Sequence, residues 1–179
     1  GKLSFEDRFL LGQSLEHYRH SVNQVEEITV VIKQYVLERF EREYNLLIEL
    51  PGVSAIVACV ILSEIGPNVE AFKSQGNLAS WAGVCPGSYE SAGIKKSSHT
   101  TQGNKYLKSI LFQAGGTAGR SKDEAFHNLY ARISGRSSKM KAIIACAHKM
   151  IRVIYKILST GEHYDAKKAL GLRQQARAN

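Results

Sequence analysis

The chain has 179 residues, which suits one medium domain or a small domain with an extension. Hydrophobic residues make up 44% of it, as in ordinary globular proteins. We find no signal peptide and no run of about 18 apolar residues, so we expect no membrane partner. Its three cysteines are far apart, and Cys59 and Cys146 lie in apolar helical runs, which indicates reduced core thiols of a cytosolic protein. No C-x-x-C pair suggests zinc, and we expect no metal site.

Charge is divided unevenly along the chain. Residues 1–90 contain 7 Lys/Arg and 12 Asp/Glu, a balance of −5, whereas residues 91–179 contain 17 Lys/Arg and 4 Asp/Glu, a balance of +13. Together these give the net charge of +8. A basic half of this size is typical of nucleic-acid-binding proteins, although net charge can also serve solubility alone. We favour nucleic acid because the cations cluster with a loop rich in Gly and Ser.

A long helix is predicted over residues 4–49, which contain no proline. Ser4 can cap its start, with Glu6 and Asp7 in the first turn. Its apolar side chains alternate in steps of four and three, the heptad spacing of a coiled coil, at Leu11, Leu15, Tyr18, Val22, Val25, Thr29, Ile32 and Val36. We favour a coiled-coil region over residues 1–45 that forms a homodimer or homotetramer, or closes antiparallel. The alternative is an amphipathic helix packed on its own domain, and the sequence leaves open a break near His20–Ser21.

A second predicted region, residues 46–160, begins with a Pro-Gly turn. Leu50-Pro51-Gly52-Val53-Ser54 ends the first helix and starts another over 55–65. This pattern resembles a helix-hairpin-helix element, in which exposed amides at the second helix's N-terminus bind a backbone phosphate. Gly52 and Ser54 are therefore candidate nucleic-acid contacts, although Ser54 stands where that element has its second glycine. A plain helical packing unit fits the pattern equally well.

The remaining elements are predicted to be helical, which gives a mostly α fold. We expect a short helix at 77–82, with Trp81 in the core, and longer helices at about 104–118, 122–133 and 138–159. Burial is predicted at Ile56, Val57, Val60, Ile61 and Ile65, and at Tyr106, Phe112, Phe126 and Tyr130. Lys149, Arg152 and Lys156 share one helical face, which suits either a phosphate-tracking edge or a solvated surface. Residues 161–179 are predicted to be a basic, frayed tail.

A long polar loop, residues 84–102, lies between two of these helices. Loops of this length in compact domains are commonly functional or disordered. It contains hydroxyls and cations but no acid after Glu90, which suits an anionic partner. Ser91 stands before the small pair Ala92-Gly93, which would let a phosphate approach closely, although a Ser-x-Gly pattern is weak by itself. Only His99 is near in sequence as a base, and a surface role fits it as well.

Several motifs occur in order along residues 46–120: L-L-I-E-L-P-G-V at 46–53, S-E-I-G at 63–66, L-A-S-W-A-G-V-C-P-G at 78–87, E-S-A-G-I-K-K-S at 90–97 and G-N-K-Y-L-K at 103–108. Together they resemble the C-terminal domain of the insertion-sequence "one-ten" and "eleven-eleven" family of transposases, which are serine and DEDD enzymes guided by a bridge RNA. The similarity extends over residues 46–160, and the preceding helix is similar to the coiled coil of such proteins.

The resemblance implies a mechanism in which a serine attacks DNA and forms a covalent phosphoserine link. By motif position this serine is Ser91. Nucleic-acid contacts are expected from the loop, the start of the next helix and the last long helix, at Gly93, Lys95, Lys96, Ser98, Gly103, Asn104, Lys105, Lys108, Lys149, Arg152 and Lys156. The implied partners are DNA, a guide RNA and further copies of the chain, in the cytoplasm of a prokaryote.

The family also has a RuvC-like domain with four acids that bind a divalent metal such as Mg²⁺. These acids have no counterpart here, and the sequence begins Gly1-Lys2, so we expect a fragment that holds no cofactor and does not recombine DNA alone. An alternative is a non-catalytic helical module for nucleic-acid binding and oligomerisation. A third reading is a coiled-coil assembly domain whose basic surface is incidental.

Overall fold

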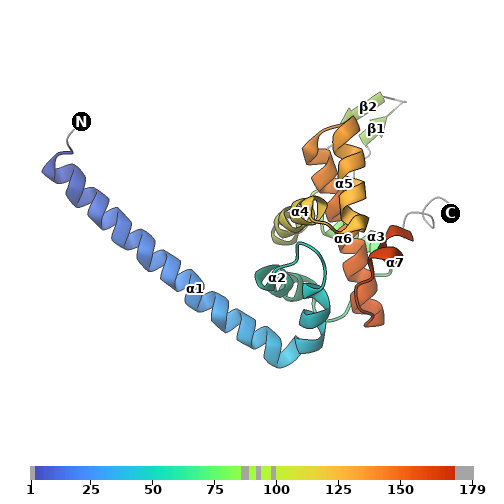
Figure 1. Cartoon of the computed structure of the whole chain (residues 1–179), viewed down its shortest axis with the longest axis horizontal. Coiled ribbons are helices and arrows are strands. Elements are labelled where there is room, and N and C mark those ends of the chain that lie inside the picture. The colour runs from blue at the N-terminus through green and yellow to red at the C-terminus, as the bar shows by residue number, and fades with distance from the viewer. Residues whose placement is uncertain (1–2, 86–88, 92–93, 98–99, 172–179) are drawn as a thin grey trace. The chain divides into compact units, whose positions relative to one another are not determined.

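The computed structural model describes residues 3–85, 89–91, 94–97 and 100–171, with the strands at 89–91 and 94–97 described by their backbone alone. The chain divides into two units, Gly1–Arg39 and Phe40–Asn179. Helix α1, Phe5–Ile48, belongs to both, and its backbone leaves helical geometry at Phe40, with φ −138° and ψ 34°, where one unit gives way to the other (Figure 1).

The first unit is a single helix whose start is capped as the sequence predicts. Ser4 Oγ accepts from Asp7 N at 3.1 Å, and Ser4 N donates to the Asp7 carboxylate at 3.1 Å. The helix continues without a break through His20 and Ser21. Most of the large apolar side chains of the heptad positions are exposed in the single chain, at Leu11, Leu15, Tyr18, Val25 and Ile32. The coiled coil therefore remains a prediction, for which these side chains provide the apolar surface.

The second unit is built mainly from helices, with one long connection between α3 and α4, and the predicted mostly α fold is confirmed. Its elements after α1 are α2 (Ala55–Ile65), α3 (Gln75–Trp81), β1 (Tyr89–Ser91), β2 (Ile94–Ser97), α4 (Lys105–Arg120), α5 (Glu124–Arg136), α6 (Lys139–Thr160) and α7 (Ala166–Gly171). A polar side chain caps the start of five of these helices, at Ser54, Ser74, Asn104, Asp123 and Ser138. These caps accept from the first free backbone amides, which sets where each helix begins.

Helix α6 lies at the centre of this unit and packs against α3, α4 and α5 (Figure 1). Phe126, Met150 and Ile154 are among the side chains buried around it. Helices α4 and α6 approach closely because Gly115 has no side chain: a Cβ there would lie 2.7 Å from Ala147 N. Burial raises the pKa of the α6 thiol Cys146 to about 11, so it is a protonated core residue.

Three predicted core residues are exposed instead. Ile56 is 53% exposed because α2 buries the face that holds residues 57, 58, 61 and 62, which Ile56 does not share. Tyr106 is 60% exposed because it lies one residue before Leu107, the first buried position of α4. Trp81 is 38% exposed and packs at its edge on Phe72, with ring centroids 5.3 Å apart. By contrast, Phe126 is fully buried as predicted.

Candidate nucleic-acid interface

Residues 82–104 connect α3 to α4 and carry the predicted serine, and we call them the Ser91 connection. Backbone hydrogen bonds join its two ends. Asn104 N donates to Trp81 O at 3.0 Å, and Thr101 N donates to Cys85 O at 3.3 Å, so the two ends of the connection run together. Gly83 has a φ of +70°, and a Cβ on Gly103 would lie 2.6 Å from the Gly83 Cα. Glycine at both positions is therefore required by backbone geometry and close approach. This contact gives Gly103 a structural role in shaping the loop, whereas phosphate contact by Gly103 stays a prediction.

Two further predicted contacts fix the connection to helix α4. Asn104 Oδ1 accepts from Tyr106 N and Leu107 N, both at 3.0 Å, while its amide nitrogen donates to the Glu64 carboxylate of α2. Lys108 Nζ donates to Thr101 O at 2.9 Å. These bonds use most of the polar capacity of the Asn104 side chain. Binding of nucleic acid by Asn104 and Lys108 remains a prediction, and holding the loop base is the role seen here.

Within the connection, β1 and β2 pair antiparallel. Ser91 is the last residue of β1 and lies opposite Ile94, while Glu90 lies opposite Lys95, with an irregularity between Tyr89 and Glu90. The predicted nucleophile therefore occupies the end of a strand in a short hairpin. Lys95 and Lys96 belong to β2. Gly93, Ser98 and His99 lie outside the described residues.

The start of α4 presents an aromatic ring beside a cation. Lys105 and Tyr106 are both exposed, and Lys105 Nζ lies 4.9 Å from the centroid of the Tyr106 ring. An exposed ring next to a positive charge is an arrangement on which a nucleic-acid base can stack while its phosphate is neutralised. The exposed ring was missed by reading Tyr106 as a core residue.

The Pro-Gly turn packs onto α4. Gly52 has a φ of +83°, and a Cβ there would lie 2.9 Å from Ala118 N and closer still to Ala114 O. Ser54 caps α2, accepting from Val57 N at 3.4 Å. Close approach to α4 accounts for the glycine without a ligand, so phosphate binding by Gly52 and Ser54 stays a prediction.

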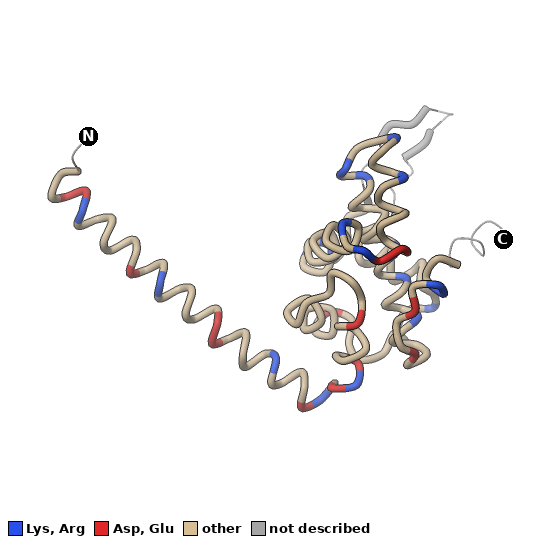
Figure 2. The backbone as a smooth tube through the Cα atoms, in the orientation of Figure 1, with Lys and Arg blue, Asp and Glu red and all other residues tan. Residues whose placement is uncertain are grey.

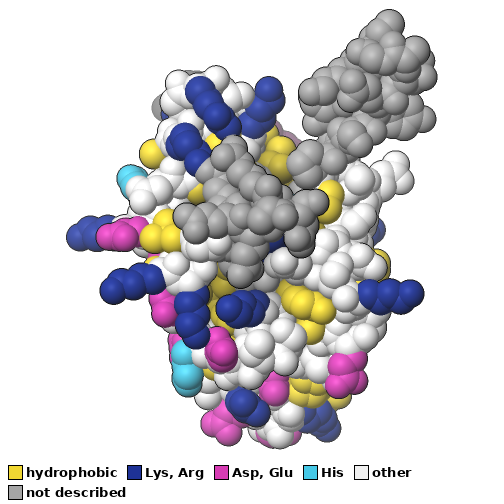
Figure 3. Space-filling model, turned by 90° about the vertical axis from the view of Figure 1, so that its right-hand side faces the viewer, with side chains coloured by type: hydrophobic (Ala, Val, Ile, Leu, Met, Phe, Trp, Pro, Cys, Tyr) yellow, Lys and Arg dark blue, Asp and Glu magenta, His cyan; other side chains and the backbone are white. Residues whose placement is uncertain are grey.

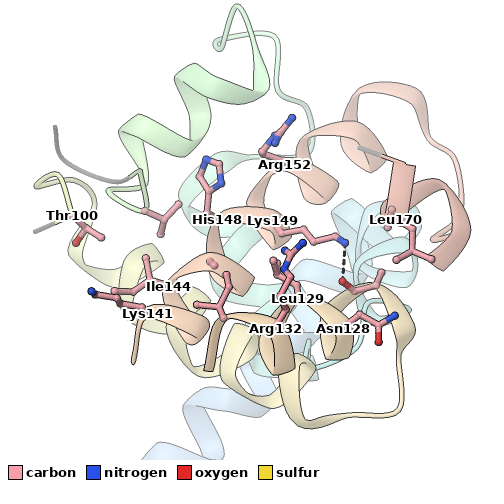
Figure 4. A pocket seen from close by; sticks show the side chains of 15 residues that line it. Thr100, Asn128, Leu129, Arg132, Lys141, Ile144, His148, Lys149, Arg152 and Leu170 are labelled. Atoms are coloured by element: carbon pink, nitrogen blue, oxygen red, sulfur yellow. Dashed lines mark hydrogen bonds between the residues drawn. The ribbon is translucent and has the colours of Figure 1, made fainter. Parts of the chain in front are cut away.

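A pocket of about 600 Å³ opens between α5 and α6 (Figure 4). It is lined by one face of each helix, because the lining residues follow helical spacing: Ala125, Asn128, Leu129, Arg132 and Ile133 on α5, and Lys141, Ile144, Ala145, His148, Lys149 and Arg152 on α6. Leu170 of α7 borders it at one edge, and Val84 and Thr100 border it where the Ser91 connection leaves α3 and returns toward α4. We call it the α5–α6 pocket.

The charge of the α5–α6 pocket has one sign. Among the described residues, its lining contains Arg132, Lys141, Lys149 and Arg152 but no Asp or Glu. The sequence has seven Lys/Arg and no acid between Glu124 and Glu162. Figure 2 shows Lys and Arg alone where α5 passes into α6. Among the described side chains on the face drawn in Figure 3, the upper end shows Lys and Arg without acids, whereas the middle and lower parts show both.

The cations at the inner wall of the pocket have neutral partners. Lys149 Nζ donates to Ala125 O at 2.8 Å, and Arg152 Nε donates to Gln75 Oε1 at 3.2 Å. Burial lowers the pKa of Lys149, which the more distant Asp123 carboxylate partly offsets. Burial, and after it the Arg152 guanidinium, lowers the pKa of His148, which favours the neutral imidazole. Both pKa shifts follow first from burial, and only that of His148 also reflects a neighbouring positive charge.

The predicted basic stripe of α6 is split by the fold. Lys149 and Arg152 line the α5–α6 pocket, whereas Lys156 lines a smaller hollow beside α7 that also contains Glu162 and Lys168. Sequence reasoning missed Arg132, Lys141 and His148. The long interval without an acid and the matching helical spacing on the two neighbouring helices are the signals that could have identified them.

In the part of the chain that the structure describes, no group of three or more His, Cys, Asp or Glu side chains is arranged to hold a metal ion. Among the described helices, none combines the length and the apolar character that a membrane crossing requires.

Known proteins resemble the chain over most of its length. It is 31% identical over 157 residues to y4pF/y4sB of Sinorhizobium fredii, a protein named as a transposase, and this match covers 83% of the chain and 39% of the relative. It is 27% identical over 169 residues to the pilin gene-inverting protein of Moraxella bovis, and 27% identical over 171 residues to that of Moraxella lacunata. Each of these two matches covers 92% of the chain and 52% of the relative.

The chain thus spans about half, or less, of the length of the curated relatives it matches. Residues 44–131 match the sequence profile described as the transposase IS116/IS110/IS902 family. This interval includes the Pro-Gly turn, the Ser91 connection and the first three pocket-lining residues of α5, whereas Arg132 and Ile133 lie just beyond it. Residues 44–131 of the chain are therefore a domain of the IS116/IS110/IS902 transposase family.

Proposed function

We propose that this chain is the C-terminal region of a transposase, and that it supplies Ser91 as the nucleophile for DNA strand cleavage and exchange. The observation that carries the proposal is the cationic, acid-free pocket surface bordered by Val84 and Thr100, next to the Ser91 connection, in a chain with a transposase-family domain. Positive charge next to a nucleophile suits a phosphodiester, whose reaction needs stabilisation of a charged transition state.

In the proposed reaction the Ser91 Oγ attacks phosphorus and forms a serine phosphodiester. The bond that breaks is the one between phosphorus and a sugar oxygen, and that oxygen leaves with a proton. The hydroxyl proton of Ser91 passes to a base. Attack by the sugar hydroxyl of another strand then releases the serine and joins the new strand. The step conserves the phosphodiester bond, so no outside energy source is required.

The rest of the proposal concerns partners. We infer that a divalent metal, Mg²⁺, is held by acids of a separate domain, where it would polarise the phosphate. The loop and α6 cations would bind DNA and a guide RNA, and the α1 helix would join copies of the chain. Lys105 and Tyr106 are suited to contact a strand near Ser91, since both are exposed.

The test uses the complete protein with its guide RNA and target DNA. Ser91→Ala should lower strand exchange by about a thousandfold or more, because the nucleophile is removed, while DNA binding stays near that of the wild type. Ser97→Ala, a hydroxyl removed from the neighbouring strand β2, is the matched control and should retain exchange. Strand exchange that survives Ser91→Ala would leave this region as a non-catalytic binding and oligomerisation module.

A further inference from the structure

We propose that the α5–α6 pocket binds one unpaired nucleotide of single-stranded DNA, with its phosphate on the cations and its base on the aliphatic wall. The chemical class follows from the lining alone. The choice of DNA over RNA rests on the function proposed above, because the pocket borders the connection whose Ser91 would act on DNA.

The first argument is that no described acid forms an ion pair with the two half-buried cations of the pocket. Lys149 and Arg152 are half-buried, and their hydrogen-bond partners among the described residues are the neutral oxygens of Ala125 and Gln75. None of the described acids comes within 4.0 Å of either cation. Withdrawing a cation from water without a counter-ion costs free energy. An anion that enters the pocket would recover part of that cost and gain charge-assisted hydrogen bonds.

The second argument is the aliphatic wall. Leu129 and Ile133 of α5, Ile144 of α6 and Leu170 of α7 line the same space as the cations. A surface that contacts only the backbone of a nucleic acid does not need an aliphatic wall, because the backbone phosphates remain hydrated. A base that leaves its stack is bound by apolar side chains that cover its faces. The volume of about 600 Å³ lies within the usual range of roughly 300–1,000 Å³ for small-molecule pockets.

The third argument is position. Val84 and Thr100 line the pocket from the two ends of the connection that carries Ser91. A strand bound at the pocket therefore lies against the base of the β1–β2 hairpin. A base in a duplex is stacked and paired, and it reaches a pocket only after both contacts are broken. The pocket should accordingly favour a single strand over a duplex.

The test measures binding of a fluorescently labelled single-stranded DNA to the full chain by anisotropy. The double variant Arg132→Gln with Lys141→Gln removes two exposed cations of the pocket lining. The double variant Arg136→Gln with Lys139→Gln is the matched control, since it removes the same charge from exposed positions nearby that do not line the pocket. Pocket substitutions should weaken binding by at least about tenfold, and control substitutions by less than about twofold.

In a second pair of variants, one fills the pocket without changing its charge, and the other is the matched control. Ala145→Met extends an α6 side chain into the space, and Ala131→Met places the same side chain on an exposed position of α5 outside it. Ala145→Met should weaken binding of the single strand several-fold and leave duplex binding unchanged. A single strand carrying 2-aminopurine should fluoresce more strongly on binding wild type than on binding Ala145→Met, because the base is unstacked only in the open pocket.

Equal losses in the pocket and control variants would overturn the proposal, and so would equal losses for single strand and duplex. A loss confined to single-stranded RNA would overturn the assignment to DNA. Thermal unfolding of each variant verifies that it folds. We expect the Arg132 and Lys141 substitutions to leave folding intact, because both side chains are exposed. Strand exchange that survives Ser91→Ala would contradict the Ser91 proposal alone. That result would not change the comparison of binding between pocket and control variants.

Discussion

The two units of the chain differ in where their apolar side chains and their charges lie. In the first unit the helix begins at Phe5 and leaves most of its large apolar side chains exposed, and residues 1–39 contain 5 Lys/Arg and 6 Asp/Glu. The described part of the second unit has a buried apolar core around α6, and residues 40–179 contain 19 Lys/Arg and 10 Asp/Glu. A lone amphipathic helix gains stability by covering its apolar stripe. The first unit is thus suited to join another helix, and the second to bind an anion on a preformed core.

The buried core of the second unit is tested by removing one buried aromatic ring. Phe126→Ala should lower the free energy of unfolding of the compact unit by about 3–5 kcal/mol, because it removes a fully buried phenyl group and leaves a cavity. Leu15→Ala, on the exposed face of α1, should change that value by less than about 0.5 kcal/mol. Urea unfolding followed by circular dichroism measures both. Equal effects would show that the two units do not differ in this way.

The next effect concerns the turn that starts α2. Gly52→Ala should destabilise the compact unit by about 2–4 kcal/mol, because a Cβ there meets the α4 backbone and the φ of +83° disfavours a side chain. Gly135→Ala is the control, since a Cβ at Gly135 meets nothing within 4 Å. That control should be neutral or slightly stabilising in a helix. A neutral Gly52→Ala would mean that the turn does not pack on α4.

The exposed seam of the first unit gives the third prediction. Val25→Glu with Ile32→Glu should dissociate the oligomer, because each charge buried in a coiled-coil seam costs at least about 2 kcal/mol. Val30→Glu with Val31→Glu introduces the same charge at exposed positions off the seam and should leave the oligomer intact. Light scattering coupled to gel filtration measures the mass. A chain that is monomeric before any substitution would contradict the coiled coil.

The smallest effect is a dependence of stability on pH through His148. Its pKa is lowered in the folded chain, by burial and then by Arg152, so the unfolded chain binds more protons as pH falls below the ordinary histidine pKa of about 6.5. Stability present above this pH is therefore lost on acidification. His148→Asn should show a smaller loss from about pH 7.5 to about pH 5.5. His127→Asn, an exposed histidine of α5, should lose as much as wild type.

Local signals predict the helices of the compact unit well. The Pro-Gly turn and the caps at Ser54 and Asn104 set where α2 and α4 begin, and they act through neighbouring backbone amides. The faces of short helices are less predictable. The inner helical face predicted for Trp81 and Tyr106 is wrong, because one residue along a helix turns a side chain by about 100° and both side chains are exposed. Tertiary packing decided which side of each helix is covered.

The candidate site was predictable in its chemistry and not in its geometry. The basic half of the chain and the Ser91 loop are visible in the sequence. The α5–α6 pocket depends on α5 and α6 packing side by side with α7 beside them, and no local pattern specifies that arrangement. The same packing separates Lys156 from Lys149 and Arg152, which a helical face alone had grouped together.

The most direct measurement looks for DNA attached to Ser91. The complete protein is incubated with its guide RNA and target DNA, digested with nuclease and protease, and analysed by mass spectrometry. The account predicts a peptide that contains residue 91 and carries a nucleotide phosphate, absent from Ser91→Ala and present in Ser97→Ala. A nucleotide found on another residue, or strand exchange without any covalent link to this peptide, would contradict it.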